Sequence, residues 1–344
     1  MNPVPTGIEP PPNRRPRRRA RAADWWWVAG ALVLVAAAAL VRPLERSGVR
    51  LSLGAPPLIG KWLPHVGPGT PAALVLAVVA VVAARRLAMV IRWPALILGG
   101  WLAAVAWTTS LALVDGWSRG WVDRLTDPNE YLHDLPRISS VGDFLRGFTS
   151  HIIDFRPGSW TTHVSSHPPA ATLAFLMLDR IGLGGGAWAG VLVVLVGSVA
   201  AVAVPQVLRS LGAPTAARKA LPFTVFLPAA VWVGVSADGM FAGVATAGLA
   251  VTVIGVLSRR RWSVVVAFAG GLLLGLMLYL SYGLALFGLV VSAAALMTAI
   301  LLHGRNGRWL PVFGRRWGAA TAGVAVVVGI FSVSGFSWFE GLSA

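Results

Sequence analysis

The chain has 344 residues, of which 56% are hydrophobic and only 12% charged, and it contains no cysteine. The charged share is about half that of soluble domains, which indicates a polytopic membrane protein, and the missing cysteine excludes disulfides, thiolate catalysis and cysteine-ligated metals. The net charge of +16 does not indicate a nucleic-acid partner, because most arginines stand in short clusters between apolar runs.

Residues 1–24 are rich in proline and arginine and precede three tryptophans at 25–27. Such a segment cannot bury a core, so we expect a disordered basic cytoplasmic arm held at the anionic inner leaflet. A cleavable signal peptide and a twin-arginine signal are the alternatives. Both are disfavoured, because no small-residue cleavage site follows the first apolar run and many further spans come after it.

Residues 25–344 hold a series of apolar runs with about the length needed to cross ~30 Å of hydrocarbon. The runs cover residues 25–41, 71–84, 93–114, 187–208, 221–236, 239–257, 263–281, 283–302 and 318–334. A further apolar stretch, 168–183, contains Asp179 and Arg180. The sequence therefore predicts an all-α, polytopic membrane helical bundle with nine or ten transmembrane helices.

Positive clusters between the runs set the orientation. They are the basic arm, Arg85/Arg86/Arg92, Arg209/Arg218/Lys219, residues 259–261, and Arg305/Arg308/Arg315/Arg316. If all are cytoplasmic, every run except 168–183 crosses a plasma membrane once and the N-terminus is cytoplasmic. We favour a non-crossing 168–183, because Asp179 and Arg180 would each cost ~2.5–3.5 kcal/mol at the bilayer centre. The alternative is a tenth crossing, which places Arg218 and Lys219 outside.

Polar chemistry is concentrated between Asp115 and Pro169, a segment that holds seven of the thirteen acids and four of the six histidines. A membrane protein that only sat in lipid would not need so long and so charged a connection. We therefore interpret residues 115–167 as an extracytoplasmic loop that carries the function.

Three features follow in chain order within this loop. Asp115 stands where the third run reaches the outer surface, and Asp127-Pro128 predicts a helix start with Asp127 as N-cap and Glu130 in the first turn. A helical stripe then predicts an amphipathic helix on the outer leaflet. Its apolar side chains are Phe144, Leu145, Phe148, Ile152 and Phe155.

His163 and His167 are four residues apart and would suit a metal if they lay on a helix. The two serines before Pro168-Pro169 argue against a helix there, which favours hydrogen bonding to a phosphate or to the loop. A divalent metal stays an open alternative, and no other cofactor is indicated. Acids and bases at the membrane boundary indicate function by default, so Asp179, Arg180 and Asp238 are further candidates.

The order of these motifs resembles the membrane-embedded GT-C glycosyltransferases that use polyprenyl-phosphate sugars. This group contains the protein O-mannosyltransferases and the lipid A aminoarabinose transferases. The resemblance covers roughly residues 93–300, and the Ala-, Arg- and Gly-rich usage resembles an actinobacterial member. Its motifs are Asp127, Glu130 and Tyr131, then His167-Pro168-Pro169, then Pro228, Ser236 and Asp238. This chain departs from the family in its dispersed loop acids and in Ala170, which replaces the usual glycine.

The resemblance implies an inverting transfer of a sugar from a polyprenyl phosphate to a hydroxyl of a cell-envelope glycan, lipid or protein on the extracytoplasmic face. A carboxylate would accept the proton of that hydroxyl. Asp115 and Asp127 rank equally as the base, with Glu130 third. Candidates for binding the leaving phosphate are Arg137, Arg146, Arg156, His163 and His167.

Two other functions stay open. A transporter or flippase for a lipid-linked sugar would show inverted repeats and helices broken near the midplane, which the glycines at 184–186 and 270–275 permit. The ionisable residues cluster outside the membrane instead, which favours the transferase. A non-catalytic scaffold would have loop acids that point away from any lipid-accessible cavity.

Overall fold

The computed structural model describes residues 25–26, 28–37, 47, 65–153, 156–258, 260–303 and 310–343. Over this part of the chain it consists of helices, turns and irregular segments without a β-strand, which confirms the predicted all-α bundle. The basic arm at 1–24 and residues Arg259, Arg305 and Arg308 lie outside the described residues. By internal contacts the chain divides into Met1–His65, whose described part includes an apolar helix at Val28–Ala37, and Val66–Ala344.

The described residues of the second unit include five helical segments that are long and apolar enough to cross a membrane. They are Thr70–Val90, Trp93–Asp115, Gly186–Ser210, Ala237–Leu257 and Pro311–Val333. Shorter apolar helices cover Ser263–Leu278 and Tyr282–Ala294. These lengths indicate a membrane protein, while nine or ten crossings remain a prediction.

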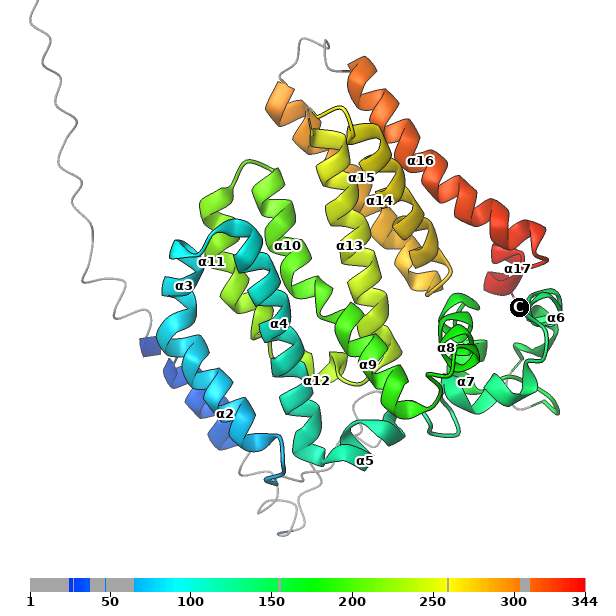
Figure 1. Ribbon diagram of the computed structural model, residues 1–344, viewed down its shortest axis with the longest axis horizontal. Helices are drawn as coiled ribbons and strands as arrows, with labels where there is room; N and C mark the ends of the chain where they lie inside the picture. Colours follow the sequence, from blue (N-terminus) through cyan, green and yellow to red (C-terminus); the bar gives the residue numbers. More distant parts are fainter. Residues whose placement is uncertain are drawn as a thin grey trace, which may run out of the picture. The chain divides into compact units, whose positions relative to one another are not determined.

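The bundle follows the chain order shown in Figure 1. Its elements are α2 (Thr70–Val79), the π-helical η1 (Ala80–Ala84), α3 (Arg85–Val90), α4 (Trp93–Ala112), α9 (Gly186–Gly197), α10 (Val199–Ser210), α11 (Pro214–Val225), α12 (Ala230–Val233), α13 (Ala237–Leu257), α14 (Ser263–Leu278), η6 (Tyr282–Leu284), α15 (Ala285–His303), α16 (Leu310–Val333) and α17 (Trp338–Ser343). Prolines stand in the first turns of α4 and α11, where a missing N–H costs no intrahelical hydrogen bond.

Helix α13 is the centre of the bundle and packs against α9, α10 and α14. Glycine permits this close packing: a Cβ on Gly243 would overlap the backbone carbonyl of Val196 in α9. In the apolar stretch of α13, 56% of the residues are buried, whereas in that of Thr70–Val90 only 6% are buried. The first long helix of this unit is therefore peripheral.

The apolar run predicted at 221–236 is not one helix. Helix α11 begins earlier, at Pro214, and ends at Val225, and the short α12 begins only at Ala230. Pro228 lies between them, and proline lacks the backbone N–H for a helical bond and disfavours helical geometry at the residue before it. Apolar composition alone did not reveal this interruption.

The predicted external loop is a chain of short helices that lies at one end of the bundle (Figure 1). They are η2 (Leu113–Asp115), α5 (Trp117–Gly120), η3 (Val122–Arg124), η4 (Tyr131–Arg137), α6 (Val141–Gly147), η5 (Thr149–His151) and α7 (Thr162–Ser165), and α8 (Ala170–Arg180) follows the loop. With 11 residues, α8 is roughly 16 Å long and too short to cross ~30 Å of hydrocarbon. Its length agrees with the non-crossing interpretation of 168–183.

The apolar stripe of the loop faces protein rather than lipid, which corrects the prediction of a helix lying on the leaflet. Phe144, Leu145 and Phe148 are buried. The ring of Phe148 packs edge-on against Phe336, with centroids 5.4 Å apart, and Phe144 packs in the same way against Trp160 at 5.3 Å. These rings therefore belong to a core that joins the loop to the bundle, and Phe155 lies outside the described residues.

Candidate functional site

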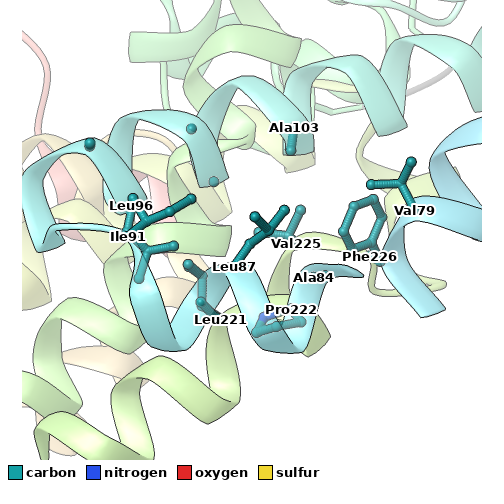
Figure 2. Close-up of a pocket in the computed structure, with 14 residues that line it drawn as sticks. Val79, Ala84, Leu87, Ile91, Leu96, Ala103, Leu221, Pro222, Val225 and Phe226 are labelled. Atoms are coloured by element: carbon teal, nitrogen blue, oxygen red, sulfur yellow. The ribbon is translucent and has the colours of Figure 1, made fainter. Parts of the chain in front are cut away.

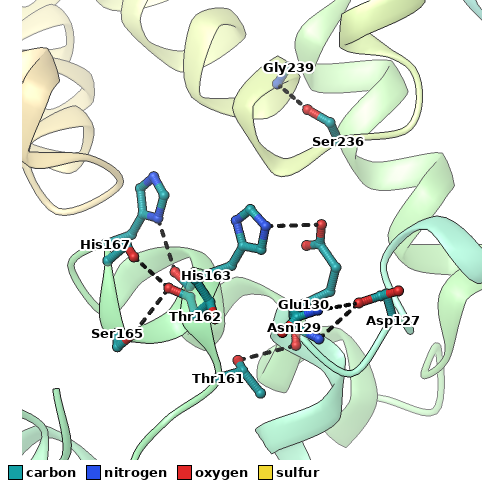
Figure 3. A network of polar contacts seen from close by, with 11 residues as sticks. Asp127, Asn129, Glu130, Thr161, Thr162, His163, Ser165, His167, Ser236 and Gly239 are labelled. Carbon is teal, nitrogen blue, oxygen red and sulfur yellow. Dashed lines mark hydrogen bonds and ion pairs between the residues drawn. The ribbon is translucent and has the colours of Figure 1, made fainter. Parts of the chain in front are cut away.

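Three segments that are distant in the sequence converge at the loop end of the bundle (Figure 3). We call Glu130, Tyr131, His163, His167 and Asp238 the Glu130 cluster. Nε2 of His163 lies 3.6 Å from Oε1 of Glu130, and the backbone N–H of His163 donates to the carbonyl of Asn129 at 3.1 Å. The ring of His167 lies 5.4 Å from that of Phe241 in α13, one turn beyond Asp238.

A tight turn presents Glu130 to the cluster. Oδ1 of Asp127 accepts hydrogen bonds from the backbone N–H and the side-chain amide of Asn129, both at 3.0 Å. The N–H of Glu130 then donates to the carbonyl of Asp127 at 2.8 Å. Asp127 is therefore a turn residue and not the predicted helix N-cap, because its carboxylate closes an Asx turn before helical geometry begins at Tyr131.

The environment of Glu130 makes its carboxylate more basic. Its side chain is 21% exposed, and burial raises its pKa above the ordinary value. The positive charges of His163 and Arg124 oppose this shift, whereas the negative charges of Asp127 and Asp238 add to it. A carboxylate whose pKa is moved toward neutral pH is better suited to accept a proton during a reaction.

Tyr131 fills the centre of the cluster. It is 1% exposed, and its ring lies 5.6 Å from Phe175 and about 6 Å from both histidines. Burial raises its pKa well above the usual range, with further contributions from Asp238 and Glu130, so the hydroxyl stays protonated. That hydroxyl is buried without a hydrogen-bond partner among the described residues. It is a buried donor that this part of the protein itself leaves unsatisfied.

His167 has one defined tautomer when neutral. Its Nδ1 lies 3.0 Å from the carbonyl of His163, and a carbonyl only accepts, so Nδ1 carries the hydrogen. Burial lowers the pKa of His167, which keeps the ring neutral near pH 7. In that state Nε2 is an acceptor, so the neutral ring suits a hydroxyl group better than the phosphate suggested by the sequence.

Only His163 lies on a helix and His167 follows two residues after its end, in agreement with the sequence argument against one helix holding both. Residues Thr162–Ser165 form the single turn α7, and the rings of His163 and His167 lie nearly parallel with centroids 6.4 Å apart. Proline restricts mainly the residue before it, here His167, and leaves 162–165 free to turn.

Asp115 occupies a different position in the loop. It ends η2 and forms an ion pair with Arg119 of α5, and the two side chains are 40% and 60% exposed. Gly116 follows it with a φ of +82°, a conformation that glycine adopts without strain and that turns the chain from η2 into α5. The loop thus separates Asp115 from the turn that carries Asp127 and Glu130.

The predicted phosphate-binding arginines have structural partners. Arg137 donates to the fully buried Asp134 at 2.6 Å and to the carbonyls of Gly158 and Ser159, and its guanidinium lies 4.7 Å from the centre of the Trp160 ring. Asp134 also accepts from the N–H of Thr161 at 2.7 Å, so this pair joins η4 to the segment before α7.

The remaining predicted residues lie on the surface of the loop. Arg146 pairs with Asp143, whose pKa is lowered by the hydrogen bond from that arginine, and Arg156 is exposed. Arg180 donates to the carbonyl of Ser139 at 3.0 Å from the end of α8, and Asp179 beside it is exposed.

Sequence reasoning missed Arg124. It is an exposed cation at the end of η3, and its charge lowers the pKa of Glu130. The sequence offers only a weak signal, its position shortly before Asp127-Pro128. Asp134 was also missed as the organiser of the loop, because one of its partners, the N–H of Thr161, is 27 residues away in the sequence.

No group of three or more His, Asp or Glu side chains in the described part of the chain is arranged to hold a metal ion. Comparisons with protein-family models, curated proteins and solved structures gave no significant match. The function has to be inferred from the Glu130 cluster and its surroundings.

Proposed function

We propose that this chain is a GT-C-type membrane glycosyltransferase that moves a sugar from a polyprenyl-phosphate donor to a cell-envelope hydroxyl. One observation carries the proposal, namely the convergence of the Glu130 cluster at one end of an apolar helical bundle. A partly buried carboxylate with a raised pKa there adjoins two histidines and a buried tyrosine hydroxyl. In this proposal the loop is extracytoplasmic and the N-terminus is in the cytoplasm of a plasma-membrane protein.

Glu130 is the general base in the proposed reaction. The acceptor hydroxyl gives its proton to the Glu130 carboxylate while its oxygen bonds to the anomeric carbon of the donor sugar. The bond between that carbon and the phosphate oxygen breaks, and the electron pair leaves with the polyprenyl phosphate. A single displacement of this kind inverts the anomeric centre.

The local contacts favour Glu130 over the two acids ranked above it from the sequence. The Asp127 carboxylate accepts two hydrogen bonds within its own turn, and Asp115 is held by Arg119. Both carboxylates are engaged by these contacts, which an incoming acceptor hydroxyl would have to displace. Burial, in contrast, raises the pKa of Glu130.

The rest of the cluster can bind the donor. Arg124 and a protonated His163 would compensate the charge of the leaving phosphate, and the Tyr131 hydroxyl would donate a hydrogen bond to it or to the sugar. Neutral His167 would accept a hydrogen bond from a sugar or acceptor hydroxyl through Nε2.

A lipid-linked sugar transporter is the second candidate, and the interruption between α11 and α12 favours it, because transporters commonly use broken helices. The interrupting residues, Phe226 to Ala229, include no ionisable side chain that would bind a sugar phosphate or a coupling ion. The chemistry of the Glu130 cluster therefore supports the transferase more strongly.

The test is sugar transfer from a panel of radiolabelled polyprenyl-phosphate donors to envelope acceptors, in membranes containing wild-type protein, Glu130→Gln or Asp127→Asn. Glutamine keeps the size of Glu130 but cannot accept the proton, so Glu130→Gln should lower the rate on the order of 10²- to 10⁴-fold. Asp127→Asn should retain most activity.

Three outcomes would contradict the proposal or part of it. Full activity in Glu130→Gln removes Glu130 from the role of base, and loss of activity only in Asp127→Asn transfers that role to Asp127. Folded wild-type protein that transfers no sugar from any donor rejects the transferase. Movement of intact labelled donor across vesicle membranes would then support the transporter.

A further inference from the structure

An apolar groove of about 230 Å³ lies between α3, α4 and α11, away from the Glu130 cluster. Figure 2 shows Ile91 and Leu96 at one end of the groove and Val79 and Phe226 at the other. Its walls are formed by apolar side chains and glycines, and Gly99 and Gly100 leave room along α4. Such a groove accepts a hydrocarbon chain rather than a polar ligand.

The length of the groove matches one leaflet of a bilayer. From Val79 to Ile91 a helix advances roughly 18 Å, and half of a typical hydrocarbon core is about 15 Å. The groove therefore matches a phospholipid acyl chain of that leaflet in length. A polyprenyl chain is much longer and would extend beyond it.

The Ile91 end of the groove is surrounded by cations. Arg218 donates through Nη1 to the carbonyls of Ala88 and Ile91, at 2.6 and 2.8 Å, and both acceptor residues line the groove. The guanidinium groups of Arg218 and Arg209 lie 5.8 and 4.7 Å from the centre of the Trp93 ring. In the sequence, Arg92 and Lys219 adjoin this end of the groove, and Arg85 and Arg86 stand about halfway along it.

These cations have no acidic partners in the described part of the chain. The ion pairs found there all lie in the loop, between residues 115 and 163. Six positive charges gathered without carboxylates attract anions strongly, and the anions at a membrane surface are lipid phosphates. Because both bonds of Arg218 come from Nη1, its Nη2 remains available to a phosphate oxygen.

We propose that this groove is a binding site for an anionic phospholipid, with one acyl chain between α3, α4 and α11 and the phosphate at the Ile91 end, beside Arg92 and Arg218. The lipid belongs to the leaflet at the basic end of the bundle. Its chain fills the space beside Thr70–Val90, which has the smallest buried share of the five long apolar helical segments named above. The site is independent of the proposed sugar transfer.

The test measures lipid binding to the detergent-purified full chain by native mass spectrometry and by thermal unfolding. The probes are phosphatidylglycerol, phosphatidylcholine with the same acyl chains, and undecaprenyl phosphate. Wild-type protein should retain phosphatidylglycerol and unfold at a higher temperature with it. Phosphatidylcholine should give neither effect, and undecaprenyl phosphate should not compete for the site.

Two kinds of variant separate the groove from the charges. A Cβ at Gly99 meets no atom within 4 Å, so Gly99→Leu should fill the groove, while Gly329→Leu adds the same side chain at an equally open position on α16. The triple variant Arg85→Gln, Arg86→Gln, Arg92→Gln removes the charges, with Arg260→Gln, Arg261→Gln as its control. Gly99→Leu and the triple variant should weaken phosphatidylglycerol binding on the order of 100-fold, and the controls should bind like wild type.

Equal binding of phosphatidylglycerol and phosphatidylcholine would overturn the proposal. So would wild-type affinity in both Gly99→Leu and the triple variant. Binding of undecaprenyl phosphate that depends on Gly99, without binding of phosphatidylglycerol, would show that the groove holds a different class of lipid.

Discussion

Oε1 of Glu130 lies 3.6 Å from Nε2 of His163, and the backbone of His163 is bonded to the carbonyl of Asn129, the residue before Glu130. The main chain therefore fixes the spacing of the two side chains. Substituting either side chain should change the chemistry of the pair without rebuilding the loop.

The pH dependence of sugar transfer should report the pKa of Glu130. Because burial raises that pKa, the rate should fall on acidification at a pH above the ordinary glutamate value of 4.5. The charge of Arg124 lowers the pKa and that of Asp127 raises it. Arg124→Gln should therefore move the acid limb of a kcat/KM profile to higher pH, and Asp127→Asn should move it to lower pH. Shifts in the same direction would contradict this electrostatic account.

The stability of the fold should depend on His167 at mildly acidic pH. Burial lowers its pKa in the folded state from the ordinary 6.5, so below pH 6.5 the unfolded state binds more protons than the folded state. The free energy of unfolding should fall as the pH drops from 6.5 toward the folded pKa. His167→Gln should remove this component, seen as a smaller difference in unfolding temperature between pH 7.5 and pH 5.5. An unchanged difference would assign the effect to other groups.

Asp134→Ala should destabilise the loop. The buried carboxylate binds both Arg137 and the N–H of Thr161, and losing a hydrogen bond to a charged group costs about 1.5–3 kcal/mol. Denaturant unfolding in detergent measures the loss. Asp143→Ala is the matched control, because its pair with Arg146 is exposed and should contribute little. Equal effects of the two substitutions would refute the structural role of Asp134.

Gly190→Ala should loosen the contact between the loop and α9. A Cβ at Gly190 would lie 2.5 Å from Nε1 of the buried Trp121, whose ring N–H donates to the carbonyl of Ala187. Overpacking of this kind costs about 1–3 kcal/mol. Gly288→Ala adds a methyl group in open space on α15 and should leave stability unchanged or slightly raised. Amide hydrogen exchange in η3 that is faster in Gly190→Ala but not in Gly288→Ala would place the loss of stability at this contact.

Apolar run length was enough to predict an α-helical membrane bundle, because burial in lipid imposes that length on the sequence. It failed at Pro228, where one residue divides a run that is apolar throughout. The helical stripe that contains Phe144 and Phe148 was also assigned wrongly to the leaflet, because the spacing of apolar residues is the same whether protein or lipid covers them.

The candidate site was only partly readable from the sequence. The motif order drew attention to Glu130, His167 and Asp238, but their proximity depends on how the loop packs against α13. The prediction that Asp127 is a helix N-cap was wrong, because an aspartate before proline is equally common in a helix N-cap and in an Asx turn, and the local sequence does not distinguish the two. The role of Arg137 depends on Asp134 and on backbone carbonyls about twenty residues away, which no local pattern encodes.

The helix Thr70–Val90 is hydrogen-bonded to the rest of the bundle near its two ends, and side chains in its middle are exposed. The N–H of Gly69 donates to the carbonyl of Leu113 at the start, Arg218 binds the carbonyls of Ala88 and Ile91 near the finish, and Val81 and Val82 in the middle are almost fully exposed. In a bilayer, lipid supplies the missing lateral support. A detergent harsh enough to strip that lipid should therefore free this helix first, while α13 and its neighbours stay folded, and preparations would differ in this one helix according to how they were solubilised.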